Sequence, residues 1–243
     1  MYYCLTKSVI MFKNYLFLNN KPKFDFSCNT EILFVVTSTI RPPQIPLSYC
    51  KVRSVYSSEE RYLQTLSTIK SININAPGST IILLENSFLS NDERLAISNM
   101  NVQIASFCDD KEAVKWRDSI YKGAGELYML INAIKLLKNT YYSKMFKISG
   151  RYRLTQNFDH RRFSSDKFGF IERDGSCSTR LYSVPKSLEK IYEQQLKKTF
   201  KKAKKGVSIE TIIMSGISSN VLELLPYVGV SGEIAVNGDP IIE

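Results

Sequence analysis

Apolar residues gather into four runs that predict the strands of a buried sheet. The first, "EILFVVTSTIRP" at 31–42, is almost continuously apolar and rich in β-branched residues until Pro42-Pro43 stops it. Similar runs follow at 80–87, 102–110 and 144–154, and the last of them is "KMFKISGRYRL". Because these runs stay apolar instead of alternating, they are typical of strands buried on both faces, as in a parallel sheet.

Segments with helical spacing of apolar residues separate these runs. At 57–72, "SSEERYLQTLSTIKSI", one of two serines can cap a helix whose first turn holds an acidic pair. Glycines open an amphipathic helix at 122–139, and Gly206 ends another at 186–205. A shorter helix is expected at 91–100.

The remaining segments complete the prediction of the fold. Residues 166–174 and 179–185 resemble a pair of strands, and 227–239 a glycine-punctuated strand or loop. The alternation of strands and helices predicts an α/β fold with an open mixed sheet, mostly parallel in its first half and flanked by helices. No internal repeat or low-complexity linker interrupts the chain, so we expect one domain over 1–243, with 1–30 as an N-terminal extension or edge segment.

Composition narrows the possible partners. The 243 residues are 44% apolar and 12% aromatic, which is enough for a sizeable core and excludes a wholly disordered chain. The net charge of +10 implies an anionic partner, which can be a nucleic acid, a membrane surface or a small molecule that carries phosphate. Charge alone does not choose among the three.

Cysteine usage and the absence of long apolar runs bear on the compartment. The five cysteines are scattered, no pair has C-x-x-C spacing, and His160 is the only histidine, so neither a zinc site nor a disulfide framework is expected. Lys7 and Lys13 interrupt the apolar start of the chain, which has no A-x-A cleavage site, and no run of 18 apolar residues follows. We therefore predict a cytoplasmic protein, and leave a peripheral membrane position open. The cysteines are Cys4, Cys28, Cys50, Cys108 and Cys177.

Polar residues mark the places where the predicted strands end. In open α/β sheets, ligands bind outside the carboxyl ends of the strands. The mixture of hydroxyl, amide, acidic and cationic groups suits a sugar nucleotide, although strands always emerge into polar loops and each position alone has that simpler explanation. The residues are Thr37, Ser38, Thr39, Arg41, Glu85, Asn86, Ser87, Asp109, Asp110, Ser149, Gly150 and Arg151.

Four segments carry a resemblance to a known family. In order and spacing, "VVTSTIRP", "IILLENS", "YKGAGELYMLINAIKLLKN" and "MFKISGRYRL" resemble the glycosyltransferase A fold over residues 31–155. The later "TRLYSVP" and "SIETIIMSGI" resemble small glycosyltransferases of viral and bacterial polysaccharide pathways that carry a K-I-S-G-R-Y segment. The resemblance implies a nucleotide-sugar-binding half at 31–155 and an acceptor half at 156–243.

The chain departs from this family at the metal site. Ser149 and Arg151 stand where the family's D-x-D aspartates would hold a divalent cation. Arginine can instead stabilise the departing diphosphate through charge-assisted, often bidentate bonds, and Gly150 lets the backbone approach a ligand. We predict that Arg151 replaces the metal and that no cofactor is required, with Mn²⁺ or Mg²⁺ left open. The alternative is that Arg151 pairs with a carboxylate such as Glu126 or Glu172.

Other residues are assigned by the same comparison. Lys122 and Arg180 are candidates for phosphate contact, and Arg41 lies near the expected base and phosphate site, although each can equally be a solvated surface cation. Glu85 and Asp109 are expected to meet the ribose or the base.

An inverting transferase needs a carboxylate to take the proton from the acceptor hydroxyl. We choose Glu210 in "GVSIETII", although a glutamate at the start of a helix is also favoured by the helix dipole. The sequence does not decide between inversion and retention. The full set of candidate bases is Asp159, Glu172, Asp174, Glu210 and Glu233.

A lysine-rich segment at 197–205 has two interpretations. The simpler one is a solvated helix end, where lysines are favoured by the dipole, and the sharper one is a patch for an anionic membrane or acceptor. The lysines are Lys197, Lys198, Lys201, Lys202, Lys204 and Lys205.

The first hypothesis is therefore a glycosyltransferase that moves a sugar from a nucleotide-sugar donor to a hydroxyl of a glycan acceptor. The alternative is a basic α/β protein that binds nucleic acid or a membrane surface without catalysis. No nucleic-acid module is recognisable, so no nucleic-acid partner is expected. A nucleotide-dependent methyltransferase is disfavoured, because "TSTIRPP" follows the first strand in place of a G-x-G-x-G-type loop.

Overall fold

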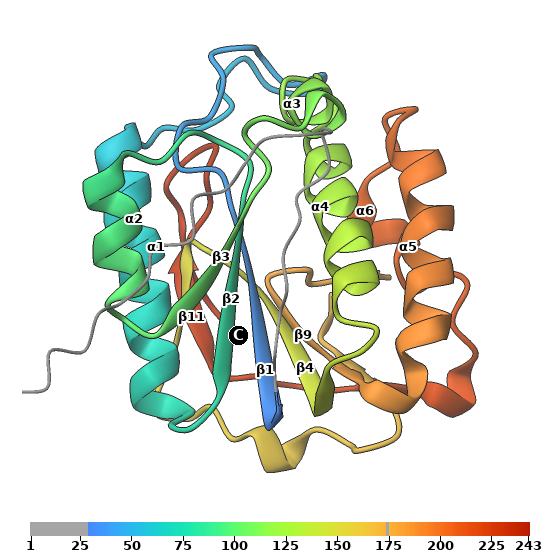
Figure 1. Cartoon of the computed structure of the whole chain (residues 1–243). Helices are drawn as coiled ribbons and strands as arrows, with labels where there is room; N and C mark the ends of the chain where they lie inside the picture. Colours follow the sequence, from blue (N-terminus) through green and yellow to red (C-terminus); the bar gives the residue numbers. More distant parts are fainter. Residues whose placement is uncertain (1–28, 174) are drawn as a thin grey trace, which may run out of the picture.

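The computed structural model describes residues 29–173 and 175–243. Residues 1–28 and Asp174 lie outside the described residues, and with them nearly all of the N-terminal segment and one candidate base. Figure 1 shows a twisted central sheet with helices packed on both of its faces.

The main sheet has seven strands in the order β10-β6-β9-β4-β1-β2-β3. Neighbours from β4 to β3 pair in parallel, whereas β9 is antiparallel to both β4 and β6, and β10 is parallel to β6. The predicted open mixed sheet with a mostly parallel first half is confirmed. The strands are β1 Asn29–Ser38, β2 Thr80–Glu85, β3 Val102–Ser106, β4 Tyr141–Ser149, β6 Phe168–Phe170, β9 Leu181–Pro185 and β10 Leu222–Leu224.

Six α-helices lie in the described part of the chain, and the four expected helices are among them. The first begins at a capping box in which Ser57 and Glu60 each satisfy a backbone N–H of the other. A helix at Lys111–Arg117 was not predicted. It is capped by the Asp110 carboxylate, which accepts from the backbone N–H groups of Glu112 and Ala113. The helices are α1 Ser58–Asn75, α2 Asn91–Ser98, α3 Lys111–Arg117, α4 Lys122–Leu136, α5 Glu189–Ala203 and α6 Ile209–Ile212.

Alternate side chains of β1 serve two separate cores. Leu33 and Val35 face the core under α4 and α5, and Phe34 and Val36 face the core under α1 and α2 (Figure 1). This is the burial on both faces that the unbroken apolar run predicts. None of the helices in the described ranges is long and apolar enough to cross a bilayer.

The strand predicted at 144–154 is wrong in one respect, because it breaks in the middle. The chain leaves the main sheet at Gly150, whose N–H donates to the carbonyl of Thr37 at 2.8 Å. A Cβ on Gly150 would lie 3.2 Å from both Ser38 Cβ and Thr65 Oγ1, so close packing against β1 and α1 favours glycine here. The break places Arg151 at a corner, from which β5 continues into a second sheet.

Small sheets and turns complete the chain. The second sheet has the order β12-β11-β5, and the predicted pair at 166–174 and 179–185 is found as β6 against β9. The strand predicted at 102–110 ends early, because a turn begins at Phe107. The remaining elements are β5 Tyr152–Leu154, β7 Glu172–Arg173, β8 Ser176–Cys177, β11 Val230–Glu233, β12 Pro240–Ile242, and 3₁₀ turns at His160–Arg162, Lys186–Leu188 and Ser219–Val221.

Candidate functional site

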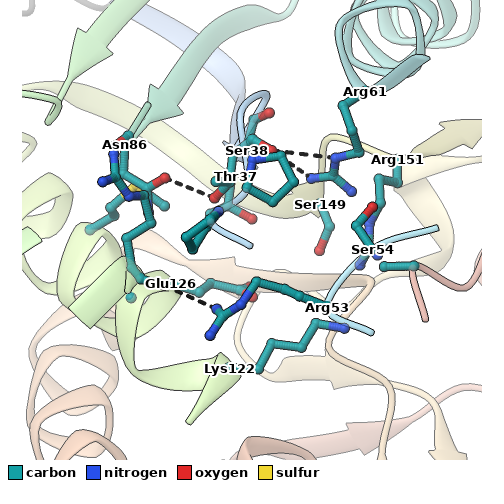
Figure 2. Close-up of a pocket in the computed structure, with 17 residues that line it drawn as sticks. Thr37, Ser38, Arg53, Ser54, Arg61, Asn86, Lys122, Glu126, Ser149 and Arg151 are labelled. Carbon is teal, nitrogen blue, oxygen red and sulfur yellow. Dashed lines mark hydrogen bonds between the residues drawn. The ribbon is translucent and has the colours of Figure 1, made fainter. Parts of the chain in front are cut away.

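Two adjoining cavities form a cleft at the carboxyl ends of β1, β2 and β4. The β1 cavity, shown in Figure 2, is lined by Thr37, Ser38, Thr39, Pro42, Pro43, Arg53, Ser54, Arg61, Asn86, Arg117, Gly125 and Met129. The α6 cavity, of about 400 Å³, lies between the start of α4 and α6, and its lining includes Tyr49, Thr179, Arg180, Ser208 and Glu210. Lys122, Glu126, Ser149, Arg151 and Ala235 line both cavities.

Four cations around the β1 cavity have no carboxylate partner. Arg53, Arg61, Lys122 and Arg151 line it, and within residues 29–173 and 175–243 none of them forms an ion pair. A fifth, Arg117, is paired with Asp118 at 2.7 Å. The cavity therefore concentrates positive charge that no direct ion pair in the described structure neutralises.

Backbone carbonyls hold two of these guanidinium groups in place. Arg61, buried in α1, donates from Nε and Nη2 to the carbonyl of Thr39 at 3.3 and 3.1 Å. Arg53 donates to the carbonyls of Ile45 and Arg117 at 2.9 and 3.0 Å, and also to that of Ser119. Carbonyl acceptors orient a guanidinium but leave its full charge in place.

Arg151 differs from both because its side chain has hydrogen-bonding capacity to spare. Its Nη1 atom is buried and has no hydrogen-bond partner in the described structure, and its guanidinium lies 5.3 Å from the centre of the Tyr152 ring. The alternative pairing with Glu126 or Glu172 is not found. Glu126 pairs instead with Lys147, and Glu172 lies in the exposed strand β7. A buried donor without a partner is uncommon in native proteins, and a bound ligand is one explanation.

The cations also perturb one another. Desolvation by surrounding protein atoms, and then the charge of Arg151, lower the pKa of Lys122 to about 8, although Lys122 is exposed to solvent, which screens the effect. Burial, and then Arg151, lower the pKa of Arg61 to about 9. An anion bound between these groups would relieve their repulsion.

The cleft brings together most of the residues predicted from the sequence. Thr37, Ser38, Thr39, Asn86, Lys122, Ser149 and Arg151 line the β1 cavity, and Arg180 and Glu210 line the α6 cavity. The Thr39 hydroxyl donates to the Asn86 side chain at 2.8 Å, which ties the end of β1 to the end of β2.

Four predicted donor-binding residues do not line the cleft. Arg41 pairs with Glu93 at 2.9 Å and donates to a nearby carbonyl, so it points away. Glu85 is fully buried and accepts from backbone N–H groups, and burial raises its pKa. Asp109 lies exposed in the turn after β3, and Gly150 packs against protein atoms, not toward a cavity.

The charged groups around the α6 cavity are largely matched. Glu243 pairs with Arg180 at 2.5 Å and with Arg173 at 3.2 Å. The Arg180 Nε also donates to the Tyr152 hydroxyl at 3.2 Å. Glu210 accepts from the Thr179 hydroxyl at 3.3 Å and from a neighbouring serine, so its carboxylate faces the cavity without a cation bound to it.

The other candidate bases in the described part of the chain lie elsewhere. Asp159 pairs with Arg161 at 2.9 Å, which lowers the pKa of Asp159 to about 2. Glu233 lies in a neighbouring cavity between α1 and β11, which Arg151 also lines, and it accepts there from Gln64 at 3.4 Å.

Sequence reasoning missed Arg53 and Arg61, which line the cleft, and Lys147, which is buried behind it. Lys147 is the clearest omission, because a lysine inside the apolar run "MFKIS" is a signal that was present in the sequence. Arg61 lies in the first turn of α1, where a cation is ordinarily solvated, and Arg53 lies in a loop without periodicity. Neither position carried a signal.

The family resemblance implies a divalent cation, so we tested whether the cleft residues fit one. In the ranges that the structure describes, no group of three or more His, Cys, Asp or Glu side chains could hold a metal ion. Glu126 is engaged by Lys147, and Glu210 by hydroxyl donors. These residues do not fit a cation held by protein ligands.

Comparison with known proteins adds little about function. The sequence matches no family model and no curated protein. Similar solved structures include a CTP:phosphocholine cytidylyltransferase from Streptococcus pneumoniae, with 9% identity over 86% of this chain and 96% of that chain and a TM-score of 0.49. A glycosyltransferase, GlyE, from Streptococcus pneumoniae TIGR4 has 10% identity over 81% of this chain and 45% of that chain, with a TM-score of 0.46. A cytidylyltransferase from Leptospira borgpetersenii serovar Hardjo-bovis has 7% identity over 68% of this chain and 65% of that chain, with a TM-score of 0.37. The chain thus spans less than two thirds of the length of the glycosyltransferase and of the Leptospira cytidylyltransferase. At these identities and TM-scores, the likeness says nothing about what this chain binds.

Proposed function

We propose that the protein is a glycosyltransferase that moves a sugar from a nucleotide-sugar donor to a hydroxyl of a glycan acceptor, without an obligatory metal. One observation supports this above all. Four cations without carboxylate partners line a single cavity at the carboxyl ends of parallel strands, where α/β proteins bind nucleotides.

The charge of the cavity fits a diphosphate. A departing nucleoside diphosphate gains negative charge in the transition state, and cations at fixed positions stabilise that charge. Arg151 would bind the phosphate oxygens through its unused Nη1, with Lys122 and the oriented guanidinium groups of Arg53 and Arg61 around it. In this role the cations replace a metal.

The polar residues at the strand ends would contact the rest of the donor. Thr37, Ser38, Thr39 and Asn86 would bind the nucleoside, and Ser149 would lie near the phosphates. Arg41, Glu85, Asp109 and Gly150 are not part of the proposed site, because they do not line the cleft.

The α6 cavity would hold the acceptor. Glu210 would accept the proton of the attacking hydroxyl while the new bond forms between that oxygen and the anomeric carbon. The bond from the anomeric carbon to the diphosphate oxygen breaks in the same step, and its electron pair leaves with the nucleoside diphosphate.

An anionic phospholipid surface is the proposed membrane partner of the lysine-rich helix. Lys197 and Lys201 of α5 and Lys204 at its C-cap line a groove of about 590 Å³ against α4, with Leu136 and Phe200 also in its lining. Lysines around apolar side chains suit the boundary between phosphate headgroups and acyl chains. The cytoplasmic location predicted from the sequence belongs to this proposal. The three cysteines in the described residues, Cys50, Cys108 and Cys177, form no disulfide.

The experiment that tests the function is a thermal-shift and calorimetry panel. Nucleoside mono- and diphosphates and sugar nucleotides are added to the protein with and without excess chelator. We expect one class of nucleoside diphosphate to raise the melting temperature, because a ligand of the native state stabilises it by mass action. The increase should survive chelation and be lost in Arg151→Ala.

Two results would contradict the proposal. The first is a melting temperature that no nucleotide changes, combined with salt-sensitive binding to nucleic acid, which is the behaviour of a basic binding protein. The second is nucleotide binding that requires a divalent cation, which would overturn the metal-free part alone.

A further inference from the structure

Lys147 is a charged side chain in the interior of the main sheet. It lies in β4 between Phe146 and Ile148, and all three residues are fully buried. Burial lowers the pKa of Lys147, and the neighbouring Glu126 carboxylate opposes that effect. Burying an ammonium group is unfavourable unless its partners are well placed, so a lysine here needs an explanation.

The ammonium group has three donors, and three acceptors receive them. Its Nζ atom pairs with the Glu126 carboxylate, and it donates to Ser149 Oγ at 2.8 Å and to the carbonyl of Thr179 at 2.6 Å. All three partners line the cleft: Glu126 and Ser149 line both cavities, and Thr179 lines the α6 cavity. The buried charge is therefore connected to the cleft through every hydrogen bond that it makes.

The contacts also fix the direction of the Ser149 hydroxyl. Ser149 Oγ accepts from Lys147, so its single hydrogen points away from the ammonium and remains free to donate. A hydroxyl in this state can donate to a phosphate oxygen beside Arg151. On the other side, the Thr179 hydroxyl donates to Glu210, so the same lysine connects the two cavities.

We propose that Lys147 is a positioning residue of the transferase, which directs the Ser149 hydroxyl toward the donor diphosphate and holds the Glu126 carboxylate at the junction of the two cavities. The sugar must lie at this junction during transfer, and Glu126 would accept hydrogen bonds from its hydroxyls. This inference rests on the proposed function and adds the residues that place the donor.

The test compares variants of Lys147 and Ser149 in nucleoside diphosphate binding, with calorimetry as the readout. Ser149→Ala should weaken binding about tenfold, because it removes a hydrogen bond to a charged group. Lys147→Met should weaken it at least as much. The double variant should be little worse than Lys147→Met alone, since the lysine acts on the ligand through the Ser149 hydroxyl.

A second lysine of the same strand supplies the matched control. Lys144 donates to the carbonyls of His160 and Phe163, and it does not line the cleft. Lys144→Met should lower the melting temperature and leave the dissociation constant unchanged. The conservative Lys147→Arg should restore part of the affinity that Lys147→Met loses.

Folding failure is covered by two further variants. If Lys147→Met does not fold, Glu126→Gln/Lys147→Met removes both charges of the pair and avoids an unpaired carboxylate beside the buried methionine. If neither variant folds, Ser149→Ala still tests the contact, because it removes a single hydroxyl that lines the cleft. Unchanged nucleoside diphosphate affinity in Ser149→Ala would then contradict the inference.

The outcomes separate this inference from the proposed function. If the wild-type protein binds no nucleoside diphosphate, the proposed function fails and this inference fails with it. If the wild type binds but Ser149→Ala binds equally well, or the effects of Ser149→Ala and Lys147→Met simply add, the proposed function stands and Lys147 only ties elements of the fold together.

Discussion

Two arginines flank the same aromatic ring, and their surroundings differ. The guanidinium carbons of Arg151 and Arg180 lie 5.3 and 5.6 Å from the centre of the Tyr152 ring. Arg180 pairs with the buried Glu243, whereas Arg151 forms no ion pair in the described structure and keeps a buried donor unused. Protein groups thus match both the charge and the hydrogen bonds of Arg180, whereas Arg151 has the Tyr152 ring beside it but keeps one donor that no protein group accepts.

A similar contrast separates other cations of the cleft. Arg173 and Arg180, which line only the α6 cavity, share one carboxylate, whereas burial and then the charge of Arg151 lower the pKa of Lys122, and no carboxylate forms an ion pair with either group in the described structure. Cations without ion-pair partners destabilise a fold, and the proposed function explains their presence at the β1 cavity by an anionic ligand.

The largest effect is expected from the proposed base. Glu210→Gln should lower the rate of donor hydrolysis or transfer by about 10²- to 10⁴-fold, the usual range for general-base catalysis. Nucleoside diphosphate affinity should stay unchanged, because Glu210 belongs to the other cavity. Glu233→Gln is the control, since Glu233 lies outside the cleft. Equal rates for Glu210→Gln and wild type would remove Glu210 from the mechanism.

The two arginines should respond in opposite ways to substitution. Arg151→Ala should weaken nucleoside diphosphate binding about 10- to 100-fold and leave the melting temperature unchanged or higher, because it removes a repelled charge. Arg180→Ala should lower the free energy of unfolding by about 2 kcal/mol, because Glu243 loses a partner while buried, and should leave affinity nearly intact. Calorimetry and thermal melting of both variants measure the two effects. A reversed pattern would show that Arg180, not Arg151, holds the diphosphate.

A smaller effect separates the two faces of α5. Lys201 lines the groove against α4 and Lys202 does not. Lys201→Ala should weaken binding to vesicles of anionic phospholipid by about fivefold at low salt, the worth of one lysine near such a surface. Lys202→Ala removes the same charge but should weaken vesicle binding less than Lys201→Ala does. Identical losses in cosedimentation would mean that only net charge matters.

The smallest effect concerns the pKa of Lys122. Because its folded pKa is about 8, the lysine loses its charge as pH rises through 8, and diphosphate affinity should fall about two- to threefold between pH 7 and 9. Lys122→Met should remove this dependence. Calorimetry of both proteins across that range would detect it, and a parallel decline in both would assign the effect to another group.

The same shift has a consequence for stability without ligand. Between pH 8, near the folded pKa of Lys122, and pH 10.5, its ordinary pKa, the lysine is more fully protonated in the unfolded chain than in the folded one. Lys122 therefore destabilises the folded state most below pH 8, and this destabilisation fades as pH rises toward 10.5.

The fold was predictable because its signals are local. The unbroken apolar run of β1 is typical of a strand covered on both faces, and the serine cap and acidic first turn of α1 mark its start. The break after β4 was not predictable in this way. It depends on how closely Gly150 packs against Ser38 and Thr65, which only the assembled tertiary structure decides.

The candidate site was predictable only in part, for a similar reason. Residues at strand ends meet at one edge of the sheet, so Thr37, Asn86, Ser149 and Arg151 could be grouped from the sequence. Arg61 reaches the same cavity from the first turn of α1. Nothing in the local sequence distinguishes it from an ordinary solvent-exposed cation on a helix.

The most direct test of the central claim is a crystal structure of the protein with a nucleoside diphosphate, grown in excess chelator. The account predicts phosphate oxygens within hydrogen-bonding distance of Arg151 Nη1, in the β1 cavity and with no metal ion bound. Diphosphate bound elsewhere, or the Arg151 side chain turned into an ion pair with a protein carboxylate, would contradict it.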